Sequence, residues 1–308
     1  MTEAQSTLMH IEAGQAPARV KAQRSQNAKT VQSLAASLRK LPPPLVVTCA
    51  RGSSDHAAVY AKYLIENTLG IPVLSMPPSV GSLYRVRQNI GGALFIAISQ
   101  SGKSPDILLS AEAAKAAGAR LVAIVNDTGS PLAGMADILI PMHAGPERSV
   151  AATKSFICSL AAVFQLTAHW AQSDEFIDGL AGLPDMLEAA FALDWHGAIA
   201  PLETAVNMFV VGRGFGLGIA NEAALKFKET CGLHAESYSA AEVKHGPMTL
   251  VKKDFPVLAF SSRDESQASI DDVVQDFTGR GARVLSAGRA YKGAINLPTV
   301  QCSLPELL

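Results

Sequence analysis

Hydroxyl and amide side chains gather where an apolar run gives way to a helix-forming segment. Residues 92–98 are apolar enough for a buried strand, and Pro105 opens a segment free of helix breakers that ends at Gly118. Ser104 is a natural N-cap residue, and Asp106 falls in the first helical turn. Helix N-termini at the carboxyl ends of strands attract anions, so this turn predicts a phosphate site. Its expected ligands are Ser99, Gln100, Ser101 and Ser104.

No arginine fork accompanies these side chains, which favours a compact phosphate monoester held by hydroxyls and backbone N–H groups. The alternative is a serine-rich cap on a purely structural turn. Residues 51–56 form the corresponding loop after the preceding strand, where Ser53 and Ser54 could face the same ligand. A structural reading of that loop is equally open.

A second polar cluster lies in the other half of the chain. Glu222, Lys226 and Glu229 recur at helical spacing and share one helix face, which is also the pattern of an ordinary solvated face. His245 follows on the Gly-Pro-containing turn 244–247. A carboxylate and a histidine suffice for proton transfer next to a carbonyl group, so Glu229 and His245 are candidate catalytic residues.

Composition and motifs argue against several other classes of protein. The formal net charge of −1 gives no basic excess for nucleic acid, and no apolar stretch is long enough to span a membrane. Residues 212–218 are glycine-rich but miss the dinucleotide-binding spacing. No metal-ligand spacing or signal peptide is recognisable, so we expect a cytoplasmic protein with no cofactor and no metal. The four cysteines are interpreted as reduced core thiols: Cys49, Cys158, Cys231 and Cys302.

The elements that must position these residues occur twice, at an offset of about 162 residues. Each copy alternates short β-branched strands with amphipathic helices, which predicts an α/β fold of two tandem, doubly wound parallel sheets. In the first copy we expect a long helix from Ser149 to Trp170, whereas the second copy ends soon after its last strand, near Ile295. We therefore expect the second domain to lack its C-terminal helix and tail. The expected parts are a helical arm (1–40), a first domain (41–170), a helical connector (171–200) and a second domain (201–308).

Four ordered motifs resemble the SIS (sugar isomerase) family, and in particular the isomerase half of glucosamine-6-phosphate synthase. They are Ser99–Gly102, Glu147–Lys154, Glu222–Glu229 and Lys244–Pro247. Details within residues 50–56, 102–106 and 228–232 are most similar to stand-alone SIS-type glucosamine-6-phosphate deaminases. The resemblance implies flavodoxin-like SIS domains in both halves of the chain.

The resemblance also implies roles for individual residues. Ser99, Gln100, Ser101 and Ser104 would bind the sugar phosphate, and Ser54 and Val150 would contact the sugar chain. Glu229 would move a proton between C1 and C2, and His245 would assist ring opening from the other subunit of a homodimer. Glu222, Lys226 and Ser53 would support the site.

Two features depart from the synthase pattern. Lys103 stands where the synthase has a glutamate, and no residue here matches the lysine near the synthase C-terminus. No glutaminase part is recognisable in the chain, which favours release of ammonia over its incorporation. The expected function is deamination of glucosamine 6-phosphate to fructose 6-phosphate. The alternatives are an aminotransferase-like or aldose–ketose isomerase reaction on the same class of phosphosugar, and a non-catalytic phosphosugar sensor.

Overall fold

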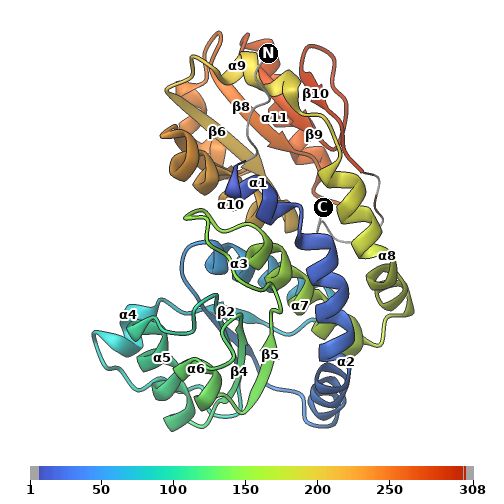
Figure 1. Cartoon of the computed structure of the whole chain (residues 1–308). Helices are drawn as coiled ribbons and strands as arrows, with labels where there is room; N and C mark the ends of the chain where they lie inside the picture. The colour runs from blue at the N-terminus through green and yellow to red at the C-terminus, as the bar shows by residue number, and fades with distance from the viewer. Residues whose placement is uncertain (1–6, 301, 303–308) are drawn as a thin grey trace. The chain divides into compact units, whose positions relative to one another are not determined.

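The computed structural model describes residues 7–300 and 302 and divides into two compact units, shown in Figure 1. The division falls between Leu187 and Glu188, inside helix α8 (Asp174–Phe191) and within the segment expected as a connector. Among the described helices, none is long and apolar enough to cross a lipid bilayer.

The first unit is built on a parallel sheet in the order β2-β1-β3-β4-β5. Helices connect the strands, as parallel pairing requires. The strands are β1 (Val46–Cys49), β2 (Val73–Ser75), β3 (Leu94–Ser99), β4 (Arg120–Val125) and β5 (Ile138–Pro141). The helices are α3 (Ser53–Leu69), α4 (Pro78–Ser82), α5 (Pro105–Ala116), α6 (Pro131–Met135) and α7 (Lys154–Ala171).

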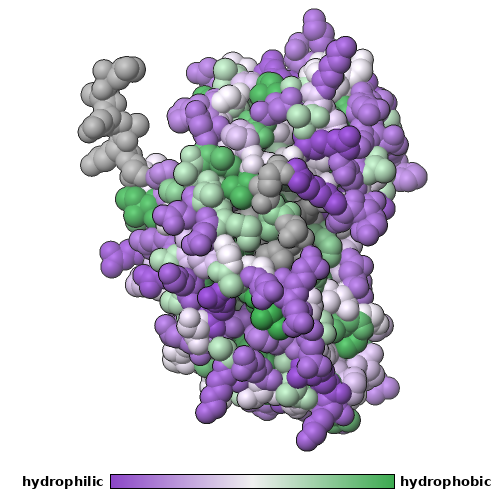
Figure 2. Space-filling view, turned by 90° about the vertical axis from the view of Figure 1, so that its right-hand side faces the viewer, coloured by the Kyte–Doolittle hydropathy of each residue, from purple (hydrophilic) through white to green (hydrophobic). Residues whose placement is uncertain are grey.

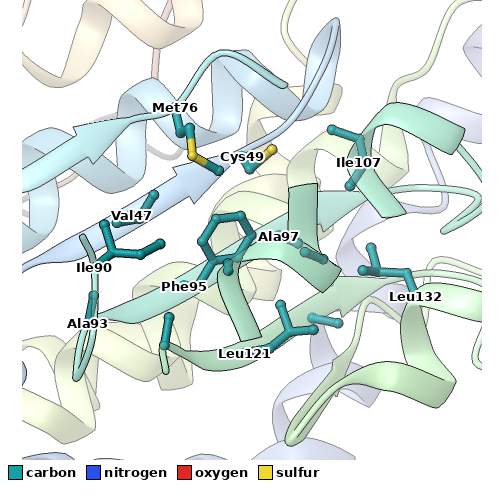
Figure 3. Packing of buried hydrophobic residues seen from close by; sticks show 14 of the residues in the cluster. Val47, Cys49, Met76, Ile90, Ala93, Phe95, Ala97, Ile107, Leu121 and Leu132 are labelled. Carbon is teal, nitrogen blue, oxygen red and sulfur yellow. The ribbon is translucent and has the colours of Figure 1, made fainter. Parts of the chain in front are cut away.

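Strand β3 lies at the centre of this sheet, and each of its six residues is buried. Phe95 has no exposed surface and lies among Val47, Ala97 and Leu121 from its own and neighbouring strands (Figure 3). Such a run of apolar residues without alternation is typical of a parallel strand that is covered on both faces. The rigid core therefore ends at Ser99, where the predicted phosphate loop begins.

The N-terminal arm consists of α1 (Leu8–Ala13) and α2 (Ala16–Lys40). Helix α2 packs against α7 through apolar side chains such as Val31 and Leu34, which are almost fully buried. Gln23 adds a buried hydrogen bond of 2.8 Å from its amide nitrogen to the carbonyl oxygen of Cys158 in α7. The arm is thus an integral part of the first unit.

The second unit repeats the same parallel order, β7-β6-β8-β9-β10. Two helices and two 3-10 turns accompany this sheet at its strand connections, and α9 (Ile199–Leu202) precedes it. The strands are β6 (Asn207–Gly212), β7 (His234–Ser239), β8 (Pro256–Phe260), β9 (Arg283–Ala287) and β10 (Ile295–Leu297). The connecting elements are α10 (Phe215–Cys231), η2 (Glu242–His245), η3 (Pro247–Leu250) and α11 (Gln267–Gly279).

The duplication extends to backbone geometry. Gly52 (φ 56°, ψ −134°) precedes α3, and Gly214 (φ 57°, ψ −128°) precedes α10. Both helices have 17 residues and end at a left-handed glycine, Gly70 or Gly232. Left-handed conformations favour glycine because other residues carry a clashing Cβ atom. The predicted fold of two tandem parallel α/β sheets is confirmed.

Two details of the sequence interpretation were wrong. Helix α7 begins at Lys154 and not at Ser149, because the Glu147 carboxylate accepts the N–H groups of Thr153 and Ser155 and thereby fixes an irregular loop before the helix. Cys231 is exposed and Cys302 is half-buried, so only two of the four cysteines are core thiols. Cys231 is the last residue of α10, before the chain turns at Gly232 and enters β7 at His234.

Hydrophilic side chains predominate on the face of the molecule seen in Figure 2, and hydrophobic residues occur there in small groups. Isolated apolar groups of this kind are normal for a surface in contact with water.

Replacing Phe95 with alanine is expected to destabilise the first unit by about 3–5 kcal/mol, because the lost ring leaves a cavity in a rigid core. Urea unfolding monitored by circular dichroism measures this cost. Tyr84→Ala is the matched control, since that aromatic ring is 70% exposed, and it should have little effect. Equal costs for the two variants would contradict the assignment of Phe95 to the core.

Candidate active site

A cavity of about 220 Å³ opens at the carboxyl ends of β1 and β3 in the first unit. The N-terminal ends of α3, α5 and α7 all contribute to its lining. The first turn of a helix carries backbone N–H groups without intrahelical partners and the positive end of the helix dipole. At α7, the Glu147 carboxylate already accepts two N–H groups, those of Thr153 and Ser155. The cavity is therefore suited to an anion. Its hydroxyl-bearing residues are Ser53, Ser54, Ser99, Ser101, Ser104, Ser155 and Ser159.

The loop between β3 and α5 presents most of the predicted phosphate ligands. The Ser99 hydroxyl accepts the N–H of Gly102 at 3.1 Å, and the Ser101 hydroxyl accepts the N–H of Lys103 at 3.3 Å. A hydroxyl that accepts in this way can still donate its own proton. Ser104 is the N-cap residue of α5, but its side chain makes no capping hydrogen bond. Gln100 also lines the cavity, so all four predicted ligands lie around one space.

Gly102 is required by the shape of this loop. Its φ of +61° is left-handed, and a Cβ atom at this position would lie 2.2 Å from the Ser130 hydroxyl oxygen and 2.7 Å from the Ser130 Cβ atom. Ser130 is itself fixed, because its hydroxyl accepts the N–H of Ala133 at the start of α6. The close approach allows the loop to curl around the cavity.

The loop after β1 supplies the opposite side of the cavity. Ser53 and Ser54, the first two residues of α3, both line it. Arg51 lines it as well, and its Nε–H donates to the Asp106 carboxylate in the first turn of α5. The sequence interpretation expected no arginine fork at the phosphate and did not name Arg51 as a site residue. The sequence feature that could have identified Arg51 is its position directly before Gly-Ser-Ser in residues 51–54.

A third wall comes from the segment that leads into α7. Ala152, Ser155 and Phe156 line the cavity, and the Ser155 hydroxyl donates to the Glu147 carboxylate. Sequence reasoning did not identify Ser155 as a site residue, because its contribution depends on how α7 packs on the sheet. The predicted ligand Val150 is not among the lining residues; its side chain is 98% exposed.

The remaining predicted residues belong to the second unit. On α10, the Lys226 ammonium lies 3.2 Å from a Glu222 carboxylate oxygen and 2.7 Å from a Glu229 carboxylate oxygen. Glu222 is buried, and the Glu229 side chain is one-third exposed. Lys226 therefore holds Glu229 in a defined orientation at the exposed end of the cluster. His245 is exposed at the end of η2, before Gly246 with φ +138°.

Two further observations concern thiol chemistry and metal binding. Burial raises the pKa of the Cys49 thiol and of the Cys158 thiol to about 12, so neither forms the reactive thiolate at neutral pH. Among the residues that the structure describes, no three His, Cys, Asp or Glu side chains are grouped to hold a metal ion.

Solved structures of several phosphosugar proteins are similar to this chain. A protein provisionally named phosphosugar isomerase, from Silicibacter pomeroyi DSS-3, is 44% identical with a TM-score of 0.93, over 97% of this chain and 92% of that one. The C-terminal domain of glucosamine-fructose-6-phosphate aminotransferase from Francisella tularensis is 27% identical with a TM-score of 0.76, over 93% and 85%. A glucosamine-6-phosphate deaminase from Thermotoga maritima, at 22% identity and a TM-score of 0.68 over 88% and 83%, shows the fold alone.

Sequence comparisons agree with these structures. The glutamine–fructose-6-phosphate aminotransferase (isomerizing) of Symbiobacterium thermophilum is 35% identical over 84% of this chain and 44% of its own length. The chain thus spans less than half the length of the curated relatives it matches. The family model described as the SIS domain matches residues 45–169 and 202–287, one segment for each sheet. The chain belongs to the SIS domain family and resembles the isomerase domain of these aminotransferases.

Proposed function

We propose that this chain is a phosphosugar enzyme that deaminates glucosamine 6-phosphate to fructose 6-phosphate and ammonia. The observation that carries the proposal is the serine-lined cavity of about 220 Å³, in which three helix N-termini meet beyond the strand ends. Such a cavity offers neutral donors to a phosphate monoester. The motif resemblance to SIS-type deaminases supports the choice of amino sugar.

The proposed chemistry uses one proton shuttle. In the open-chain substrate the aldehyde is at C1 and the amine at C2. Glu229 takes the proton from C2 while the C1 oxygen accepts a proton from water, which gives an enolamine. Glu229 then returns its proton to C1, and the nitrogen releases a proton as C2 becomes an imine. Water adds to the imine carbon and ammonia leaves, which gives the ketose phosphate. His245 would assist ring opening, from the partner subunit of a homodimer, and Glu222 and Lys226 would hold Glu229.

A second candidate is aldose–ketose isomerisation of a phosphosugar. It is favoured by the 44% identity to the Silicibacter pomeroyi protein, whose name describes an isomerase. Amination with an external ammonia donor uses the same proton transfer in reverse. A non-catalytic sensor would need the cavity but not the Glu229 carboxylate.

The deciding assay incubates the protein with glucosamine 6-phosphate and measures ammonia and fructose 6-phosphate together. Deamination is expected to yield the two products in equal amounts. Interconversion of glucose 6-phosphate and fructose 6-phosphate without ammonia release would favour the isomerase. Tight binding of these sugars without any turnover would favour the sensor and contradict the proposal.

Gly102→Ala is expected to weaken phosphosugar binding about tenfold or more, because the added methyl group forces the β3–α5 loop off the cavity. The left-handed φ alone costs a non-glycine residue about 1–2 kcal/mol. Isothermal calorimetry with fructose 6-phosphate measures the change. Gly134→Ala on α6 is the matched control, since nothing lies within 4 Å of its added Cβ atom. Unchanged affinity in Gly102→Ala would show that the ligand binds elsewhere.

Glu229→Gln is expected to lower kcat by about 10²–10⁴-fold, the usual contribution of a general base, and to leave sugar affinity near the wild-type value. Glutamine keeps the shape of the side chain but cannot accept the proton. Glu203→Gln, an exposed carboxylate in the same unit, controls for loss of charge. If affinity falls as far as kcat, Glu229 has a structural role and is not the base.

A further inference from the structure

The segment from Pro146 to Thr153 connects β5 to α7 and forms irregular backbone beside the cavity. A segment of this kind needs partners for its N–H and C=O groups. One partner belongs to the segment itself: the Glu147 carboxylate accepts the N–H groups of Thr153 and Ser155 at 3.0 and 3.2 Å. The first half of the segment has its partners elsewhere.

Those partners lie in the N-terminal arm, more than 130 residues away in the sequence. The two carboxylate oxygens of Glu12 accept the N–H groups of Arg148 and Ser149, at 2.7 and 3.0 Å. Only 3% of the Glu12 surface is exposed, so the carboxylate has been removed from water to make these two bonds. Burial by itself raises the pKa of Glu12, but the two N–H donors and the nearby Lys154 ammonium outweigh it and hold this pKa below its ordinary value.

Lys154 also links the arm to this segment. Its ammonium donates to the Gln15 side-chain oxygen at 2.7 Å and to the Pro146 carbonyl at 2.5 Å, and lies 4.0 Å from Glu12. It is 1% exposed, although it is the first residue of α7. The arm therefore bonds residues 148 and 149 directly through Glu12, and it bonds Lys154, which holds the Pro146 carbonyl, through Gln15. A buried charge with these partners costs much free energy if one of them is removed.

We infer that Glu12 is a positioning residue for substrate binding, because it fixes the backbone at residues 148 and 149, three residues before Ala152 on the cavity wall. The inference rests on the proposed function for its ligand, since Ala152 and the start of α7 line the cavity where the sugar part of a phosphosugar would extend. The Glu12 carboxylate accepts hydrogen bonds from this segment, so the phosphate loop between β3 and α5 provides an internal reference. Loss of Glu12 should therefore affect the sugar more than the phosphate.

Glu12→Gln is the informative variant, because the amide can accept one N–H bond but presents its own NH₂ group to the other. Hydrogen exchange of the Arg148 and Ser149 amides is expected to become faster in this variant. The dissociation constant for fructose 6-phosphate should rise about tenfold, as expected when a hydrogen bond to a buried charge is lost. That for inorganic phosphate should change less than about twofold, since its loop is intact.

Gln23→Met is the matched control. Gln23 is equally buried on the same arm, but it donates to Cys158 in the middle of α7 and not to the segment. It should lower thermal stability without changing the ratio of the two dissociation constants. Should Glu12→Gln fail to fold, Glu12→Asp is the second variant. It keeps the charge beside Lys154 but is too short to reach both amides. The dissociation constant for fructose 6-phosphate should again rise more than that for inorganic phosphate.

Three results would overturn the inference: unchanged exchange of the two amides, a sugar affinity equal to that of wild type despite faster exchange, or equal losses for sugar and phosphate. Wild-type protein that binds inorganic phosphate but no phosphosugar would overturn the proposed function. In that case the amide exchange still decides whether Glu12 fixes the segment.

Discussion

Parallel pairing of the strands is the constraint on which this protein depends. It places the carboxyl ends of β1 and β3 on one edge of the first sheet, and each strand must then turn into a helix that covers the sheet. The unpaired N–H groups of several helices consequently face the same space. The chain adds serines to this edge, and the resulting cavity needs only one arginine, Arg51, which is already paired with Asp106.

The second copy of the fold shows what the serines contribute. Ser266 precedes α11 as Ser104 precedes α5, but Asp264 stands at the position that corresponds to Gly102. The Asp264 carboxylate accepts the N–H of Ser266 at 2.8 Å and its hydroxyl at 2.5 Å. A carboxylate of the chain thus takes the donors that a phosphate would use. The duplicated backbone supplies the fold, and we propose an anion site only for the copy whose loop lacks this carboxylate.

The fold and the β3–α5 loop could be predicted because their causes are local. The apolar run of β3, the N-cap Ser104 and the helix breaker Gly118 lie within one stretch of sequence, and the repeat could be found by comparing the halves. Arg51, Ser155 and Glu12 could not be assigned in this way. Their roles depend on which helix ends meet around the cavity, and the partner amides of Glu12 lie 136 and 137 positions further along the chain. The roles of Glu229 and Val150 remain predictions: Glu229 belongs to the second unit, and Val150 is 98% exposed.

A cavity built from hydroxyls and N–H groups also suits an enzyme that must release a phosphorylated product. Arg51 and Lys103 both carry positive charge near the loop, but each is paired with a carboxylate, Asp106 and Asp127 respectively. In the proposed site, a bound phosphate would therefore be held mainly by helix ends and hydroxyl dipoles, whose effect falls off within about one turn of the helix. Affinity would then depend on close fit more than on long-range attraction. In this proposal the fit depends on the glycine at position 102 and on the buried Glu12 carboxylate, so backbone geometry would determine specificity more than charge.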